Sequence, residues 1–358
     1  MSPHRVLLLV VASFLAGPHA AASEVPVSDL ARRLEWVGTV VSEPGWSVWC
    51  ASPIRDDTGR IHLFVSRWPS KGVQPGWHTH GEIARYVADR PEGPYSFAET
   101  VVRGTGRTGD WNAFAPHNPE VRRFGARYAL AYIANANPKQ GWPRNQSVGL
   151  LIADRLEGPW KPASGNGQAL ASSADPAHFS HGFQVVNPSL LAVGKRFHLY
   201  FKAGSPKAGE ARFGLATADR LEGPYVMSPD PISPASVTVE DACAFLWHGK
   251  IRLLTTDNHG SITGVSGAGV LWTSEDGGLT FPRERAELGF HTLPTYLPQL
   301  ASMPSRMVYG SQRKLERPKL LLDAQGEPEF LFATSGCALD GRPHTSVHLL
   351  RVARSPVR

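Results

Sequence analysis

A short motif recurs at a fixed spacing and constrains the fold of this chain more than any other feature. The motif reads Asp-Arg-x-Glu-Gly-Pro-aromatic and begins at Asp89, Asp154 and Asp219, so neighbouring copies lie 65 residues apart. A degenerate copy, Glu275 to Phe281, keeps the acidic residue, the glycine and the closing aromatic residue. Repeats of this length are typical of propellers and other arrays. We interpret the motif as a structural turn between the third and fourth strands of each unit.

Each unit contains four short segments with the character of β-strands. In the second unit they are 119–123, 128–134, 147–153 and the stretch after Trp160, bounded by glycine, proline, asparagine or aspartate. Five such units follow one another, and the last lacks its outer strand unless residues 36–41 supply it. The sequence therefore predicts an all-β, five-bladed β-propeller, closed by an N-terminal strand that pairs with the last blade.

Composition agrees with many short strands joined by tight turns. The chain has 358 residues, of which 35 are glycine and 30 proline, and only 19% are charged. The net charge of +6 comes from scattered arginines rather than a basic run, so nucleic acid is not an expected partner. We expect a monomer without a cofactor.

The first residues have the features of a secretory signal peptide. His4 and Arg5 precede the apolar run 6–16, and Ala20-Ala21-Ala22 supplies small residues for cleavage. We therefore expect a signal peptide at 1–22, one propeller domain at 23–358, and a secreted or periplasmic protein. The apolar run is short for a bilayer, and no later segment is apolar enough, so membrane insertion is not expected.

In a propeller, loops from every blade meet at one face. The loops that enter the inner strands and those that join second to third strands surround the same end of the central opening, which is the default ligand site. The entering loops are 49–52, 110–118, 181–187, 237–241 and 313–317, and the others are 68–80, 135–145, 202–212, 257–266 and 337–344.

Two further expectations concern this face. Cys50 and Cys337 fall on neighbouring blades, which makes them a candidate disulfide. His78 and His80 with Glu82 suggest a metal, but a His-x-His pair on a loop needs another convergent ligand, so no metal is expected.

The blade openings resemble those of five-bladed β-propeller glycoside hydrolases, especially glycoside hydrolase family 43 and its sucrase-like and neoagarobiose-hydrolase-like relatives. The resemblance covers all five units and rests on Asn118-Pro119, Asn187-Pro188 and Glu240-Asp241-Ala242, on second strands such as Gly125 to Leu130, and on the repeated turns. It implies a hydrolase, a glycosidase without a cofactor, that cleaves glycosidic bonds in oligo- or polysaccharides, and the signal-like first residues add the expectation that it is exported.

The same resemblance implies three carboxylates, at the openings of the first, third and fourth blades: a general base, an acid that tunes pKa and orientation, and a general acid. Glu240 matches the general acid. Ser52 stands at the first position and Asn187 at the third, and neither can serve as a carboxylate base. Inverting hydrolysis needs a separate carboxylate to activate water, so the base must be unconventional.

Other residues of this face could complete the chemistry. Glu240 and Asp241 would point to opposite sides of a strand, so Glu316 or Asp110 is the better-placed partner. His117 could also act as a base near neutral pH, in hydrolysis or in β-elimination from a uronic-acid sugar.

The remaining polar and aromatic residues of the face are candidates for substrate binding. They are Trp49, Ser52, Asn118, Asn187, His181, His259 and Arg317, with Arg67 and Lys202 as further cationic candidates. A polysaccharide lyase with His117 as base, in which Arg317 or Lys202 neutralises a uronate, is an alternative. A non-catalytic carbohydrate-binding propeller is a third interpretation.

Overall fold

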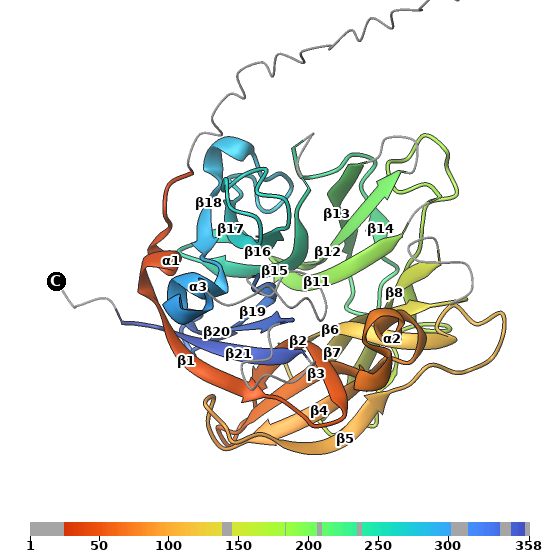
Figure 1. The fold of residues 1–358 in the computed structure, drawn as a ribbon. Coiled ribbons are helices and arrows are strands. Elements are labelled where there is room, and N and C mark those ends of the chain that lie inside the picture. Colours follow the sequence, from red (N-terminus) through yellow and green to blue (C-terminus); the bar gives the residue numbers. More distant parts are fainter. Residues whose placement is uncertain are drawn as a thin grey trace, which may run out of the picture.

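Five antiparallel β-sheets stand around a central axis, so the chain folds as the five-bladed β-propeller that its repeats predict (Figure 1). The computed structural model describes residues 25–137, 145–182, 184–205, 210–234, 238–301, 314–336 and 345–354. The first strand of each blade lies nearest the axis. The predicted signal peptide at 1–22 lies outside the described residues.

The blades follow the order of the chain. The first contains β2 (Trp46–Arg55), β3 (Ile61–Pro69), β4 (Glu82–Ala88) and β5 (Ser96–Val102). The second contains β6 (Phe114–Phe124), β7 (Arg127–Asn135), β8 (Gln146–Ala153), β9 (Lys161–Pro162) and β10 (Gln168–Leu170). The third contains β11 (Val185–Val193), β12 (Arg196–Ser205), β13 (Glu210–Ala218) and β14 (Val226–Met227).

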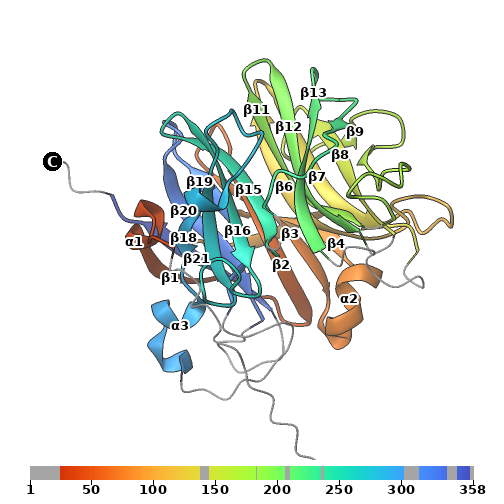
Figure 2. The ribbon, with the colours of Figure 1, turned by 90° about the horizontal axis from the view of Figure 1, so that it is seen from above.

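The last two blades complete the ring. The fourth contains β15 (Glu240–Trp247), β16 (Lys250–Asp257), β17 (Ala268–Thr273) and β18 (Glu287–Phe290). The fifth contains β19 (Glu316–Leu322), β20 (Pro328–Ser335), β21 (Ser346–Val352) and β1 (Leu34–Val41). The short helices are α1 (Asp29–Arg33), α2 (Val73–Thr79), α3 (Leu293–Tyr296), η1 (Ser70–Gly72), η3 (Arg283–Arg285) and η4 (Pro298–Ala301). Figure 2 shows α2 and α3 on the same side of the ring.

Strand β1 closes the ring, which confirms the predicted pairing. It lies antiparallel to β21, with Leu34 opposite Val352 and Val41 opposite Val347. The outer strand of the fifth blade therefore comes from the beginning of the chain. Leu34 also belongs to the buried cluster that holds Leu254 of the fourth blade and Leu331 of the fifth. Closure thus covers a sheet edge and buries apolar surface between blades at the same time.

The repeated motif forms the turn between third and fourth strands, as its sequence indicates. Its glutamate pairs with an arginine of the preceding blade: Glu92 with Arg351, Glu157 with Arg85, and Glu222 with Arg127. Its closing aromatic residue donates a hydrogen bond to the carbonyl four residues earlier: Tyr95 to Pro91, Trp160 to Leu156, and Tyr225 to Leu221. The turn glycines have φ between 84° and 89°, a conformation that favours glycine. The motif therefore recurs because it shapes a turn and joins two blades.

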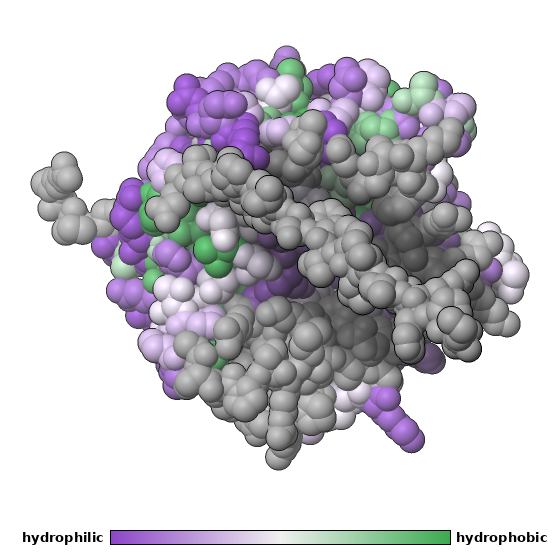
Figure 3. Space-filling view, turned by 45° about the horizontal axis from the view of Figure 1, so that its top comes forward, coloured by the Kyte–Doolittle hydropathy of each residue, from purple (hydrophilic) through white to green (hydrophobic). Residues whose placement is uncertain are grey.

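The surface gives no sign of a membrane span. None of the helices in the described ranges is long and apolar enough to cross a bilayer. The described surface visible in Figure 3 is mostly hydrophilic. The exposed large apolar side chains are scattered over the blades: Val27, Phe97, Val226, Leu246, Val265 and Leu279.

A cluster of buried charges fills the middle of the ring. Glu120, which is 1% exposed, forms an ion pair with Lys319 of the fifth blade. Its carboxylate also accepts hydrogen bonds from Ser189 Oγ at 2.8 Å and from the backbone N–H of Leu190 at 2.9 Å, both in the third blade. Lys319 Nζ donates to the carbonyl of Ala242 in the fourth blade at 2.8 Å. One ion pair therefore connects four blades.

Electrostatics within this cluster favour the charged forms. Burial opposes ionisation of Glu120, but the Lys319 and Arg122 cations outweigh it and lower the pKa of the carboxyl group. Arg122 Nε lies 3.1 Å from the carboxylate, and its Nη2 donates to Ala244 O at 2.8 Å. A buried pair of this kind contributes little relative to apolar residues of the same volume, but losing one partner leaves a buried charge without a compensating group.

Lys319→Met tests the cluster. The substitution leaves Glu120 buried beside only one cation, so we expect the free energy of unfolding to fall by about 3–5 kcal/mol. Adding Glu120→Gln removes the stranded charge, and the double variant should recover part of the loss. Denaturant unfolding of both variants and of the parent measures this. If Lys319→Met alone were as stable as the parent protein, the buried ion pair would not have the proposed role.

Candidate functional site

Each inner strand carries a residue with a left-handed backbone at its bulge, and β6 has a second such residue, Ala115, nearer its start. The bulge residues are Cys50, Asn118, Asn187, Asp241 and Arg317, with φ between 51° and 69°. The pairing register between first and second strands shifts at the same place in all five blades. The shared bulge identifies equivalent positions, and a bulge redirects side chains toward the opening. Together the five bulge residues form what we call the floor of the site.

Ser52 does not occupy the predicted position at the first opening. The positive φ of Cys50 marks that residue as the equivalent of Asn118 and Asn187. Ser52 lies two residues further along, in the layer of Glu120, and its hydroxyl accepts a hydrogen bond from the backbone of Val121 at 3.0 Å. The sequence pattern misled because the proline of Ser52-Pro53 was matched to the Asn-Pro openings, whereas the bulge has alanine after Cys50.

Hydrogen bonds connect the side chains of the floor to one another. Asp241 Oδ1 accepts from Arg317 Nη1 at 2.5 Å and from Asn187 Nδ2 at 3.3 Å. Its Oδ2 accepts from Thr256 Oγ1 at 3.0 Å and from the backbone N–H of Arg317 at 3.1 Å. Asn187 Oδ1 accepts from Arg317 Nη1 at 2.5 Å and from Asn118 Nδ2 at 3.5 Å. Asp241 is 3% exposed, so its carboxylate positions its neighbours rather than facing a substrate.

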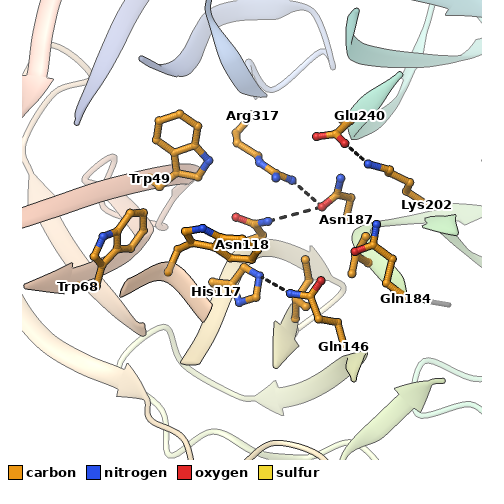
Figure 4. A pocket seen from close by; sticks show the side chains of 13 residues that line it. Trp49, Trp68, His117, Asn118, Gln146, Gln184, Asn187, Lys202, Glu240 and Arg317 are labelled. Atoms are coloured by element: carbon orange, nitrogen blue, oxygen red, sulfur yellow. Dashed lines mark hydrogen bonds and ion pairs between the residues drawn. The ribbon is translucent and has the colours of Figure 1, made fainter. Parts of the chain in front are cut away.

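A cavity of about 100 Å³ lies above this floor. Its lining consists of Trp49, Trp68, Trp77, His117, Asn118, Ile133, Gln146, Gln184, Val186, Asn187, Lys202, Glu240 and Arg317. In Figure 4, Trp49 and Trp68 of the first blade lie on one side, and Lys202 and Glu240 lie on the other. The cavity therefore combines an aromatic wall, amide groups, two cations and one carboxylate.

Glu240 is the carboxylate that lines the cavity. It is the first residue of β15 and forms an ion pair with Lys202 of β12, in the preceding blade. The Glu240 side chain is 24% exposed and the Lys202 side chain 6%. Burial lowers the pKa of Lys202 to about 7, although the nearby Asp241 carboxylate opposes this shift. In the resting site the ammonium group favours the ionised form of Glu240.

Glu316 takes the corresponding position in the fifth blade. It is the first residue of β19 and directly precedes Arg317, as Glu240 precedes Asp241. Its side chain is half-buried beside the floor and is not part of the cavity lining. Burial, reinforced by the Asp241 carboxylate, raises the pKa of Glu316 to about 7. A carboxyl group with such a pKa can both accept and release a proton at neutral pH.

His117 lines the cavity as a neutral, fully bonded imidazole. Its Nδ1 donates to the carbonyl of Ala115 at 2.7 Å, and this assigns Nε2 as the acceptor for the Gln146 amide at 3.2 Å. Burial lowers the pKa of His117 to about 3, against the effect of the Ala115 hydrogen bond. These bonds and the lowered pKa disfavour His117 as a base near neutral pH.

Three predicted site residues lie away from the cavity. Asp110 accepts hydrogen bonds from Thr105 Oγ1 at 2.6 Å and from Arg107 Nε at 3.0 Å in a partly exposed turn. His181 bonds through Nδ1 to a nearby backbone carbonyl, and His259 is exposed between β16 and β17. They were predicted because they belong to loops of the correct face. These loops are long, and the parts of them that hold these three residues do not line the cavity.

Arg67 also points elsewhere. Its Nε pairs with Glu82 at 2.8 Å, and its guanidinium lies between the rings of Trp46 and Phe97, 4.2 and 4.0 Å from their centroids. Glu82 is thereby occupied within the first blade rather than turned to the adjacent histidine pair. Among the residues in the described ranges, no three His, Cys, Asp or Glu side chains gather as metal ligands would.

Cys50 is a buried free thiol in the floor. Its Sγ donates to the carbonyl of Pro119 at 3.7 Å, and burial raises its pKa to about 12. The predicted bridge to Cys337 involves a residue outside the described part of the chain.

Several lining residues were missed from the sequence. Trp77 and Gln184 lie inside the mapped loops, and Gln146 directly follows one, so the loop mapping alone could have found them. Trp68, the first residue of the mapped loop 68–80, is 0% exposed yet contributes to the cavity wall.

Comparison with known proteins shows the fold. No family model and no curated protein sequence matches the chain. Zg3597, a family 117 glycoside hydrolase from the marine bacterium Zobellia galactanivorans, shares 14% identity at a TM-score of 0.64, over 90% of this chain and 91% of that one. The GH43_1 enzyme from Xanthomonas citri, complexed with xylotriose, shares 14% at 0.55, over 90% and 91%. A thermostable family-43 glycoside hydrolase shares 12% at 0.57, over 90% and 98%. The chain therefore has the five-bladed fold of these proteins across nearly its whole length.

The protonation of His117 can be measured without a substrate. Because its pKa is lowered from 6.5 to about 3, the folded ring should remain neutral between pH 8 and pH 5. Its contribution to stability is complete above pH 6.5 and is lost as the pH falls toward 3, since the unfolded chain binds the proton first. Histidine side-chain NMR, assigned with His117→Gln, follows the ring. A His117 signal that titrates near neutrality would reinstate it as a candidate base.

Proposed function

We propose that the protein is an exported glycoside hydrolase that cleaves glycosidic bonds in oligo- or polysaccharides. The observation that carries this proposal is a cavity on the propeller axis, in which the Glu240 carboxylate faces a wall of tryptophans above a floor that includes the Asn118 and Asn187 amides. Aromatic faces and a few fixed polar groups are suited to the apolar faces and hydroxyls of a sugar. Export is inferred from the signal-like first residues, and the glycosidase activity of similar folds supports the reaction class.

In the proposed reaction, two carboxyl groups on neighbouring blades divide the work. Glu240 gives a proton to the leaving glycosidic oxygen, and Glu316, which lies beside the floor rather than in the cavity lining, accepts a proton from an attacking water at the edge of the cavity. Asn118 and Asn187 bind sugar hydroxyls, and Asp241 holds Arg317 and Asn187 in place. The small volume of the cavity favours cleavage of a terminal sugar rather than binding along the middle of a chain.

The bonding of His117 disfavours the lyase alternative. Elimination requires a base that removes a carbon-bound proton, and His117 has both ring nitrogens engaged and a lowered pKa. A product assay on a panel of plant and algal oligosaccharides separates the functions. Hydrolysis releases new reducing ends without an ultraviolet-absorbing unsaturated sugar, elimination produces both, and a binding protein produces neither.

Glu240→Gln tests the proton donor. The amide keeps the shape of the side chain but has no proton to give, so kcat/KM on a natural oligosaccharide should fall by about 10²–10⁴-fold. An aryl glycoside with a good leaving group needs no protonation and should lose much less. Glu284→Gln, an exposed substitution in η3, is the control and should leave both rates unchanged. Equal losses on both substrates would remove Glu240 from this role.

Glu316→Gln tests the base. Water activation is needed whatever the leaving group, so both substrates should lose about 10²–10⁴-fold in kcat/KM. Added azide, a nucleophile that needs no base, should restore part of the rate with the aryl glycoside. A variant with full activity would show that another group activates water.

A further inference from the structure

We propose that Lys202 and Glu240 work as one acid: the pair holds a single exchangeable proton, which Lys202 returns to Glu240 as Glu240 passes it to the leaving oxygen. This inference rests on the proposed glycosidase function and deepens it, because it assigns Lys202 as the residue that sets the protonation of the donor. Lys202 acts through Glu240 and is therefore a positioning residue.

Glu240 and Lys202 lie one behind the other as seen from the cavity. Glu240 is the more exposed partner and faces the cavity, whereas the Lys202 side chain is 6% exposed and reaches it from the neighbouring blade (Figure 4). On β12, Lys202 stands between Val186 of β11 and Phe213 of β13, so apolar neighbours flank its backbone. The ammonium and carboxylate are in direct contact. A proton can therefore move between them without passing through water.

The surroundings of Lys202 lower the free-energy cost of moving its proton to Glu240. An ordinary lysine would hold its proton far more tightly than a carboxylate, and it would leave Glu240 ionised and unable to donate. Burial lowers the pKa of Lys202 to about 7, the Arg317 cation acts in the same direction, and the Asp241 and Glu316 carboxylates act against it. Burial also disfavours two separated charges relative to two neutral partners. The ion pair and the neutral pair are thereby brought closer in free energy.

The proton balance closes over one turnover. Lys202 passes a proton to Glu240, Glu240 passes it to the leaving oxygen as the glycosidic bond breaks, and the anomeric carbon bonds to the hydroxyl of water. The second proton of that water goes to Glu316. Release of this proton to solvent and uptake of one by Lys202 restore the starting state, so the net reaction is hydrolysis.

Two substitutions of Lys202 distinguish a shared proton from a purely structural ion pair. The two models rank the activities of these variants in opposite order. Arginine keeps the charge and the ion pair but does not release its proton, whereas methionine removes the charge and keeps the apolar bulk. If the pair shares a proton, Lys202→Arg should lower kcat/KM by about 10²-fold or more, because Glu240 stays ionised. Lys202→Met should retain more activity, with the basic limb of its pH profile moved about 1–2 units lower, because Glu240 must then hold the proton alone.

A purely structural ion pair predicts the reverse order, with arginine tolerated and methionine not, and that result would overturn the proposal. Lys250 supplies the matched control, because it forms an exposed ion pair with Glu275 at 2.8 Å. Lys250→Arg and Lys250→Met should leave the pH profile unchanged.

A measurement without substrate separates this inference from the glycosidase proposal. In the parent protein, ¹⁵N NMR of lysine side chains should show Lys202 losing its proton near pH 7, and in Glu240→Gln at lower pH, because the neighbouring carboxylate is gone. A Lys202 that stays protonated above pH 9 would refute the shared proton even in an active enzyme. Absence of activity on every sugar, with the expected titration, would refute the glycosidase function alone.

Discussion

The ion pair between Glu120 and Lys319 lies where the blades converge, and the rest of the site is built above it. Its hydrogen bonds reach Ser189 of the third blade and Ala242 of the fourth, so it links the inner strands of four blades. Burying these charges is costly, and an apolar core could hold the ring as tightly. The cluster adds geometric specificity. Its charge-assisted hydrogen bonds require a particular arrangement of donors and acceptors around the axis.

The floor is formed by the equivalent left-handed residues of the five inner strands. These residues meet in the floor, where Asp241, Arg317 and Asn187 bond to one another. With Asp241 occupied in this way, the carboxyl groups that we propose to react are those one position earlier, Glu240 and Glu316. Their environments differ, because a lysine adjoins the first, whereas burial and a carboxylate act on the second. Such divergence between two carboxyl groups is how one site separates an acid from a base.

Several parts of the fold could be read from local patterns. The Asp-Arg-x-Glu-Gly-Pro-aromatic turn depends on contacts within a few residues and on one arginine of the preceding blade, so it leaves a periodic trace in the sequence. The missing outer strand of the last blade was predictable because an unpaired sheet edge is unfavourable and an unassigned strand-like segment remained. Glu240, which lines the cavity, was selected from its opening motif. Asp110, His181 and His259 were misplaced because loop membership does not say how far a side chain lies from the axis.

The sequence by itself determined the number of blades, the closing strand and the face that holds the site, since each follows from the spacing of strands and turns along the chain. Tertiary structure decided which side chains meet. Cys50 rather than Ser52 enters the floor because of a bulge that has no fixed residue type, and Lys202 reaches Glu240 across 38 positions of sequence. Contacts between blades depend on how the strands twist and shift against one another, and a single strand's residues do not encode that geometry.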